Sequence, residues 1–313
     1  MAPSCSSFNE AWYASAKIQW SEPFKYQERA PGKRVRTELA WALAALYDLP
    51  AAQAHVLCIA IEQMNLSSLI HDDIIDGDDL RRGIPTVWRQ YGMDVALVSG
   101  MYGYLEGLHT LAQLNNLNVL RAGVESLECL HIGQYLDVKV SNGEVLPTME
   151  EYGCIAQANT GCFFVFLLKA CQCLNALDTE TYQRLESLLR LLSVYYRYVN
   201  DYCDINHIPH FEKKGFARDL EGGPKSFLMI LAGQVLVKGP LTSDQKKHII
   251  RGFGEAGVFE AALALMEQTF GQLLCDLDAI KQSHGRIAAL AVFLRDIHFQ
   301  PGPDDDYYKR VLA

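Results

Sequence analysis

The chain has 313 residues, of which 50% are hydrophobic and 21% are charged, and its mean hydropathy is +0.00. This composition is typical of a globular protein and excludes a disordered chain or a set of membrane spans. The formal net charge of -9 also argues against nucleic acid as a partner, because phosphate backbones are bound by basic surfaces.

Helical periodicity runs along almost the whole chain, and strand patterns bounded by Asn-Gly or Asp-Gly turns are nearly absent. In chain order, the predicted helices cover residues 37–47, 51–74, 93–113, 116–140, 148–174, 178–206, 224–236, 242–253, 256–282 and 284–297. Turn residues separate them, for example at Pro31-Gly32, Ser141-Asn142-Gly143 and Gly222-Gly223-Pro224. No internal repeat or linker interrupts this pattern. We therefore predict one all-α domain over residues 1–313, with residues 1–28 and 300–313 at its periphery.

The cysteines and the first residues bear on the cellular compartment. Nine cysteines are scattered through apolar stretches without metal-ligand spacing, which favours buried free thiols. Residues 1–20 lack the basic segment and the apolar segment of a signal peptide. We therefore expect a cytoplasmic protein that does not span a membrane.

A cluster of acidic residues ends the predicted helix 51–74. The stretch LIHDDIIDGDDLRRG places Asp72, Asp73 and Asp76 directly behind an apolar run. At 3.6 residues per turn, Asp72 and Asp76 lie on one face with Asp73 at its edge, and like charges so placed destabilise a helix unless a cation lies between them. A solvated helix end is the ordinary interpretation of such a cluster. Here the preceding NLSSLIH looks buried, which places the charges at the mouth of a core.

A second cluster, NDYCD, ends the predicted helix 178–206. Asn200 and Asp204 are again four residues apart, with Asp201 between them. Two such faces opposed across a helical bundle would hold hard cations such as Mg²⁺, which binds carboxylates, water and substrate phosphate oxygens. The two clusters therefore predict a site for metal and a phosphorylated substrate.

These motifs together resemble those of the trans-isoprenyl diphosphate synthases. The resemblance rests on DDIID followed by RRG, on PGKRVR upstream, on GQYLD in the middle and on the second acidic motif. With KKGFARDLEGGPKSF included, the chain is most similar to the fungal geranylgeranyl diphosphate synthases, from about Arg29 to about Leu236. The resemblance implies a class I isoprenoid synthase bundle with a central cavity, usually a homodimer. It also implies three Mg²⁺ ions that bind the diphosphate of an allylic prenyl substrate. This diphosphate is the leaving group and departs as pyrophosphate.

Carried across by position, the resemblance makes Asp72, Asp73 and Asp76 metal ligands and catalytic residues of the first motif. The second motif would contribute Asn200, Asp201 and Asp204 to the metals, with Asp201 also catalytic. The residues expected to bind diphosphate groups are Lys33, Arg36, Arg81, Arg82, Arg197, Lys214 and Lys225. Of these, Arg81 would meet the allylic diphosphate, and Lys33, Arg36 and Arg82 would bind isopentenyl diphosphate. Replacing Asp72 or Asp73 with alanine is expected to abolish turnover. Little stability should be lost, because the carboxylates repel one another.

The resemblance also implies the wall of the substrate cavity, which would include Asn65, Ser67, Ser68, Gln134 and Phe163. Ser67 and Ser68 stand just before the first motif, where the family uses bulky side chains to stop short products. Their small size predicts a floor open to a farnesyl or geranylgeranyl chain. Phe163 belongs to a set of aromatic residues that are mostly ordinary core, but some of them could stabilise a carbocation through their π faces.

Four sites depart from the family pattern, and they cluster at the chemistry. Asn65 stands where the family has a histidine for isopentenyl diphosphate, and Asn159-Thr160 replaces a Lys-Thr pair. In the second motif, FQxxDD becomes YRYVND, so Arg197 replaces the glutamine and Asn200 the first aspartate. Lys225 is displaced by one position from the lysine of EGKxSF. A weakened isopentenyl pocket would leave the allylic cation to an internal double bond, to water, to proton loss or to another nucleophile.

Three functions follow from these patterns. The first is a Mg²⁺-dependent terpene cyclase that ionises farnesyl or geranylgeranyl diphosphate. The second is a chain-elongating geranylgeranyl diphosphate synthase, which the retained Lys33, Arg36 and Arg82 favour. The third is a non-catalytic partner subunit, against which the intact DDIID and RRG speak.

Overall fold

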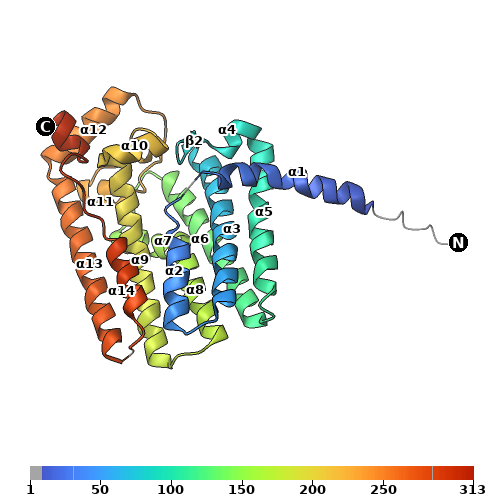
Figure 1. The fold of residues 1–313 in the computed structure, drawn as a ribbon. Coiled ribbons are helices and arrows are strands. Elements are labelled where there is room, and N and C mark those ends of the chain that lie inside the picture. Colours follow the sequence, from blue (N-terminus) through green and yellow to red (C-terminus); the bar gives the residue numbers. More distant parts are fainter. Residues whose placement is uncertain (1–8, 31, 284) are drawn as a thin grey trace.

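Long helices run side by side and form a bundle (Figure 1). The computed structural model describes residues 9–30, 32–283 and 285–313. The helices are α1 (Glu10–Glu28), α2 (Val35–Leu46), α3 (Ala51–Asp76), α4 (Val87–Tyr91), α5 (Met93–Ala112), α6 (Leu117–Ser141), α7 (Met149–Asn159), α8 (Gly161–Leu174), α9 (Thr179–Asn206), α10 (Ile208–Lys214), α11 (Phe227–Ala232), α12 (Ser243–Glu255), α13 (Val258–Ser283) and α14 (Ala288–Asp296). A hairpin of β1 (Leu80–Arg81) and β2 (Ile84–Pro85) and two short turns, η1 (Arg218–Glu221) and η2 (Tyr308–Leu312), complete the described elements. The all-α prediction is confirmed.

Apolar side chains from the long helices fill the space between them. Helix α8 buries most of its residues, and α9 buries Leu185, Leu188 and Leu192 at helical spacing. Helices α3 and α5 pack along each other so closely that a Cβ on Gly103 would lie 2.4 Å from the backbone oxygen of Gln63. Glycine is therefore required at this position of α5.

The two acidic motifs lie at the same end of the bundle. Helices α3 and α9 both run toward the upper end in Figure 1, where the hairpin and α10 follow them. The hairpin meets α10 through a hydrogen bond from the backbone N–H of Gly83 to the oxygen of Lys213 at 3.1 Å. The C-terminal turns of α3 and α9 are thereby brought together.

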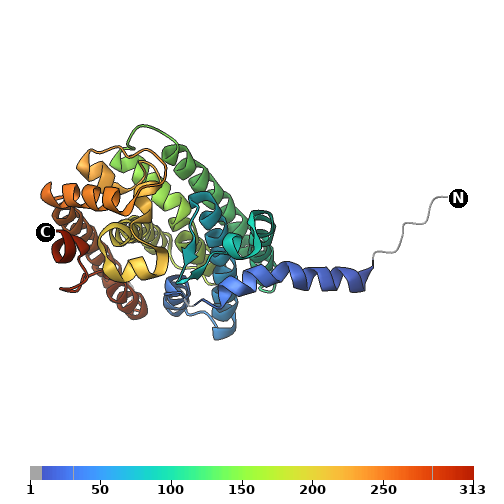
Figure 2. The same ribbon diagram turned by 90° about the horizontal axis from the view of Figure 1, so that it is seen from above.

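Helix α1 was not among the predicted helices. Asn9 caps it by accepting a hydrogen bond from the backbone N–H of Trp12, and the helix then projects from the bundle (Figures 1 and 2). Its buried residues lie in its second half, where Phe24 packs on Tyr102. With one half exposed and Pro23 inside, the helix lacks the apolar stripe on which the sequence prediction depends.

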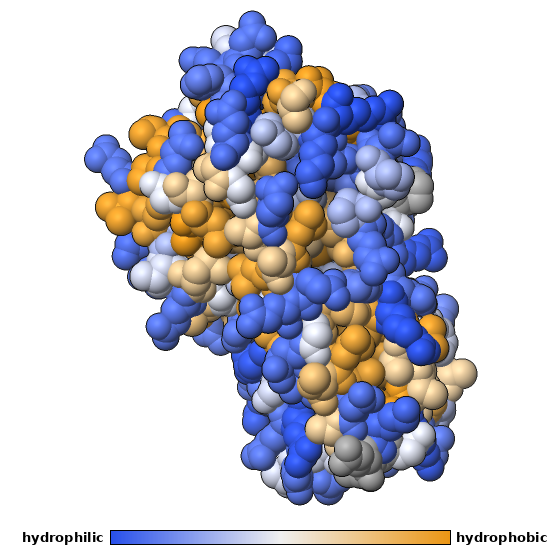
Figure 3. Space-filling view, turned by 90° about the vertical axis from the view of Figure 1, so that its left-hand side faces the viewer, coloured by the Kyte–Doolittle hydropathy of each residue, from blue (hydrophilic) through white to orange (hydrophobic). Residues whose placement is uncertain are grey.

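The C-terminal residues 300–313 are less peripheral than expected. Asp306 and Tyr307 are buried. The backbone N–H of Ile208 donates to the oxygen of Asp305 at 2.9 Å, and the side-chain oxygen of Asn206 accepts from the backbone N–H of Tyr308 at 2.8 Å. The tail therefore holds the junction of α9 and α10, next to the second acidic motif. Figure 3 shows the side of the bundle on which the C-terminus lies, where hydrophobic areas are separated by hydrophilic residues.

Two predicted helices differ from the structure. The predicted helix 148–174 is broken at Thr160 into α7 and α8, which meet at 52°. The break lies against α6, where a Cβ on Gly133 would be 2.6 Å from the backbone nitrogen of Asn159. The predicted helix 224–236 is reduced to α11, because Ser226 caps it and Gly233 ends it with φ +61. Residue 31 of a predicted turn, residue 284 of the last predicted helix and residues 1–8 lie outside the described residues.

Within the described ranges, we find no single helix long and apolar enough to cross a bilayer. The bent pair α7 and α8 meets the length and composition requirement together, but ten of the 14 residues of α8 are buried in the core. The eight cysteines in the described part of the chain are free, as predicted, although Cys154, Cys173 and Cys275 are exposed.

Candidate active site

The first acidic motif occupies the last turn of α3 and divides into two kinds of carboxylate. The side chains of Asp72 and Asp76 are 33% and 19% exposed. The side chain of Asp73 is 1% exposed and turns toward β1, where Arg81 Nε donates to its Oδ1 at 2.7 Å. Burial raises the pKa of Asp73 to about 7, although Arg81 opposes this shift. Asp72 and Asp76 thus face the open site, and Asp73 positions Arg81.

A buried carboxylate that we did not single out in the sequence supports this motif. The Asp78 carboxylate lies 3.6 Å from Arg81 Nη2, 3.7 Å from Lys214 Nζ and 3.7 Å from Arg218 Nε. Its backbone oxygen accepts hydrogen bonds at 2.8 Å from the side chains of Thr86 and Trp88. The hairpin therefore places one carboxylate among three cations, behind DDIID.

In the second motif, the carboxylate of Asp201 is enclosed by protein donors. Arg197 Nε donates to its Oδ1 at 3.1 Å, and its Oδ2 accepts from the hydroxyl of Tyr152 at 3.0 Å and from the backbone N–H of Phe227 at 3.2 Å. Burial raises the pKa of Asp201 to about 6, with Arg197 opposing the shift. Both oxygens of Asp201 are therefore occupied by hydrogen bonds.

The second aspartate of that motif, Asp204, has a hydrogen-bond donor on one oxygen only. Its Oδ1 accepts from the backbone N–H of Asp219 at 2.7 Å, and its Oδ2 lies 3.6 Å from Lys214 Nζ. Burial raises the pKa of Asp204 to about 7. Because Lys214 also lies near Asp78, it links the loop after the first motif to the second motif.

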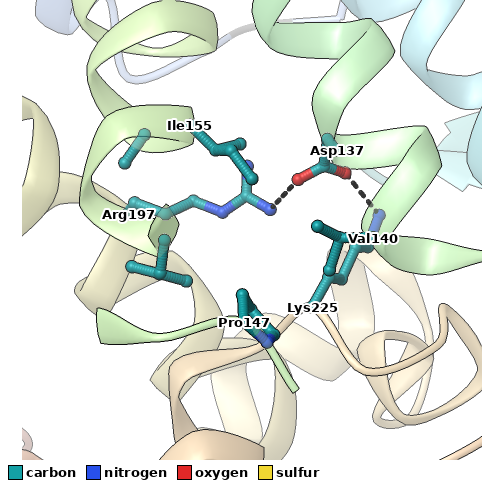
Figure 4. Close-up of a pocket in the computed structure, with 8 residues that line it drawn as sticks. Asp137, Val140, Pro147, Ile155, Arg197 and Lys225 are labelled. Atoms are coloured by element: carbon teal, nitrogen blue, oxygen red, sulfur yellow. Dashed lines mark hydrogen bonds and ion pairs between the residues drawn. The ribbon is translucent and has the colours of Figure 1, made fainter. Parts of the chain in front are cut away.

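A chain of ion pairs connects the two motifs through α6. Lys225 Nζ lies 2.7 Å from Asp76 and 3.2 Å from Asp137, and Arg197 Nη2 lies 3.1 Å from the other oxygen of Asp137 (Figure 4). A void of about 10 Å³, room for roughly one water molecule, adjoins Asp137, Arg197 and Lys225. Asp137 was not among the predicted site residues. The signal that could have found it is its place as the acid of GQYLD.

The residues expected to bind isopentenyl diphosphate lie around the segment before α2. The Arg36 guanidinium lies 5.6 Å from the ring centre of Phe163, and Arg82 Nη1 donates to the oxygen of Ala30 at 2.9 Å. Burial, and then the like charge of Arg81, lowers the pKa of Arg82. Lys33 is exposed on the same segment.

Of the predicted cavity residues on α3, Asn65 and Ser67 are buried and Ser68 is half-buried. The side-chain oxygens of Asn65 and Ser67 have no hydrogen-bond partner among the described residues. Ser68 Oγ donates to the backbone oxygen of Asn65 at 2.7 Å. Gln134, from GQYLD, donates to Asp72 Oδ1 at 3.2 Å and so belongs to the rim of the first motif.

The two motifs differ in how well they fit a divalent cation. Asp72 and Asp76 share one face of α3, are partly exposed and carry like charge, which suits Mg²⁺. Asp137 and Asp201 do not fit it as they stand, because they are buried and protein donors occupy all their oxygens. Asp72 also accepts from Gln134 and Arg81, but at 3.2 and 3.3 Å and with a third of its side chain exposed. In the described part of the chain, no three His, Cys, Asp or Glu side chains are already arranged as a ligand set.

Comparison with known proteins points to one protein family. The family model described as polyprenyl synthetase matches residues 18–266. Preasperterpenoid A synthase PvPS of Talaromyces verruculosus is 28% identical over 84% of this chain, which spans 35% of the length of that relative. Geranylgeranyl pyrophosphate synthase 1 of Zymoseptoria tritici is 27% identical over 84% of this chain and 81% of its own length. A polyprenyl synthase from Caulobacter crescentus has a similar fold, with a TM-score of 0.76 at 18% identity over 92% of this chain and 94% of that one.

Proposed function

We propose a function for this chain, which belongs to the polyprenyl synthetase family. The function is Mg²⁺-dependent ionisation of an allylic prenyl diphosphate, farnesyl or geranylgeranyl diphosphate, followed by capture of the cation without a second substrate. This is the reaction of a terpene cyclase. The observation that carries the choice is the buried Asn65, whose side-chain oxygen has no partner where the family has a histidine for isopentenyl diphosphate.

The residues of the first motif would carry the ionisation. Asp72 and Asp76 would hold the metal, which supplies positive charge to the departing pyrophosphate. Arg81, fixed by Asp73 and 3.3 Å from Asp72, presents a guanidinium beside it for diphosphate oxygens. The buried rings of Phe163 and Phe164 would exclude water from the carbocation.

Chain elongation is the second candidate. Arg82, bonded to Ala30, remains next to the segment that carries Lys33 and Arg36, so the three cations for isopentenyl diphosphate are still gathered. The relatives include both a terpene synthase and a geranylgeranyl pyrophosphate synthase, which supports either activity.

Product analysis distinguishes the candidates. The purified protein would be incubated with Mg²⁺ and farnesyl or geranylgeranyl diphosphate, with and without isopentenyl diphosphate. We expect a hydrocarbon or an alcohol in the mixture without isopentenyl diphosphate. A longer diphosphate as the main product would establish elongation instead. Release of no product in either mixture would favour a non-catalytic subunit.

Restoring the family residues at two departures should shift the product ratio. In the double variant Asn65→His, Asn200→Asp, a donor for isopentenyl diphosphate and a full charge in the second motif return. Each restored contact in a buried site contributes about 1–3 kcal/mol, so we expect a roughly tenfold or larger rise in the ratio of elongated to cyclised product. Arg197 and Asn159 remain unreverted, which keeps the recovery partial. A ratio equal to that of the wild type would show that Asn65 does not select the reaction.

Two copies of the chain are expected to associate through α5, which lies on the outer side of the bundle in Figure 1. Leu97, Met101 and Leu105 are exposed there at four-residue spacing and form one apolar stripe. Met101→Asp should convert a dimer into a monomer in sedimentation velocity, because it would bury a charge in the interface. The matched control is Val292→Asp, an exposed apolar position on α14. A wild-type monomer, or equal dissociation of the control, would contradict this interface.

A further inference from the structure

The second acidic motif contains its own cation. Arg197 lies one turn before Asp201 on α9, and its guanidinium reaches two carboxylates at once. Nε lies 3.1 Å from Asp201 Oδ1, and Nη2 lies 3.1 Å from Asp137 Oδ1 on α6. Figure 4 shows the guanidinium pointing at Asp137, which has Lys225 on its other side. One side chain thus joins the carboxylates of two helices.

These contacts occupy carboxylate oxygens of Asp137 and Asp201 that a metal would have to bind to use either residue as a ligand. The remaining oxygen of Asp201 accepts from Tyr152 and from the backbone N–H of Phe227, and the remaining oxygen of Asp137 lies 3.2 Å from Lys225 Nζ. Each of the four oxygens therefore already has a protein donor. Because Mg²⁺ binds oxygens at about 2.0–2.1 Å, it could reach Asp137 or Asp201 only by displacing one of these donors.

The charges support a permanent guanidinium at this place. The side chains of Arg197, Asp137 and Asp201 are 19%, 7% and 3% exposed. Burial alone would lower the pKa of Arg197, but Asp137 and Asp201 outweigh it and raise the pKa well above the usual value. Paired guanidinium and carboxylate groups of this kind are strong, oriented contacts.

The sequence changes in this motif match the charge of one divalent ion. Relative to the FQxxDD pattern, Arg197 adds one positive charge and Asn200 removes one negative charge. The two changes act in the same direction and together equal the two positive charges of a single Mg²⁺. The net charge of this motif is therefore two units more positive than that of the family pattern, which leaves less negative charge for a metal to neutralise.

We propose that the guanidinium of Arg197 takes the place of one divalent cation at the second acidic motif, so that Asp137 and Asp201 do not bind metal. This inference rests on the proposed metal-dependent function. It assigns to Arg197 a role as a built-in counter-ion, and it makes the number of bound ions a property that substitution at one residue can change.

The test counts ions rather than turnover. Mn²⁺ binding in the presence of inorganic pyrophosphate would be measured by electron paramagnetic resonance for the wild type and for three variants. Arg197→Gln with Asn200→Asp should bind one Mn²⁺ more than the wild type. Asn200→Asp alone should bind the same number as the wild type, because Arg197 still fills the site. Arg190→Gln, on an exposed arginine of α9 paired with Glu186, is the matched control and should also leave the number unchanged.

A second readout follows from the same contacts. Without metal, Arg197→Gln should lower the melting temperature, because Asp137 and Asp201 lose their shared counter-ion, and Mn²⁺ should raise it more in this variant than in the wild type. An equal ion count in the wild type and the double variant, or an extra ion in Asn200→Asp alone, would overturn the role of Arg197 and leave the proposed function standing. No Mn²⁺ binding by any of these proteins would overturn both.

Discussion

Replacing Asp72 with alanine is expected to slow pyrophosphate release by more than about a hundredfold, because loss of a metal ligand costs at least as much as loss of a residue that supports one. The fold should survive this change. The Asp72 side chain is 33% exposed, and its partner Arg81 keeps a closer contact with Asp73. The measurements are kcat/KM with saturating Mg²⁺ and the melting temperature of the same preparation.

The control for Asp72 is Asp79→Ala in the loop that follows α3. Asp79 forms an exposed ion pair with Arg89, and such pairs contribute little to stability. We expect wild-type turnover from this variant. If Asp72→Ala retained more than about a tenth of the activity, its metal role would have to be abandoned.

Replacing Asp73 with alanine is expected to cost about 3 kcal/mol of unfolding free energy, because it leaves the buried guanidinium of Arg81 without its nearest counter-ion. Asp73 is 1% exposed and accepts from Arg81 Nε at 2.7 Å. The sequence alone predicts that Asp72 and Asp73 behave alike, with little loss of stability in either variant. Chemical denaturation of both variants would separate them.

The comparison between the two aspartates serves as the control for this second prediction. Asp72→Ala should change the unfolding free energy by less than about 1 kcal/mol, as is usual for a partly exposed side chain. Equal losses in both variants would show that Asp73 does not hold Arg81 in place.

Periodicity was enough to predict the helices that carry the site, because α3 and α9 each bury one side along most of their length. It did not predict the break at Thr160, which lies where Gly133 of another helix approaches the backbone of Asn159. The two acidic clusters, around Asp72 and around Asp204, could also be predicted from the sequence, because the residues of each cluster lie within about one helical turn.

The contacts between the clusters could not be predicted in that way. Lys225 reaches Asp76 across 149 positions of the chain, and Arg197 reaches Asp137 across 60. Both were expected to bind diphosphate, and the structure places them in ion pairs with site carboxylates. Such pairs depend on which segments the fold brings together at one end of the bundle, and residue spacing carries no information about that.

Release of pyrophosphate from geranylgeranyl diphosphate, with Mg²⁺ and without isopentenyl diphosphate, tests the proposed function most directly. We expect many turnovers per enzyme molecule, an organic product extractable into hexane, and loss of both when Asp72 is replaced with alanine. Farnesyl diphosphate would be tried in parallel. If pyrophosphate were released from either substrate only when isopentenyl diphosphate was added, the cation would be captured by a second substrate and the cyclase proposal would be wrong.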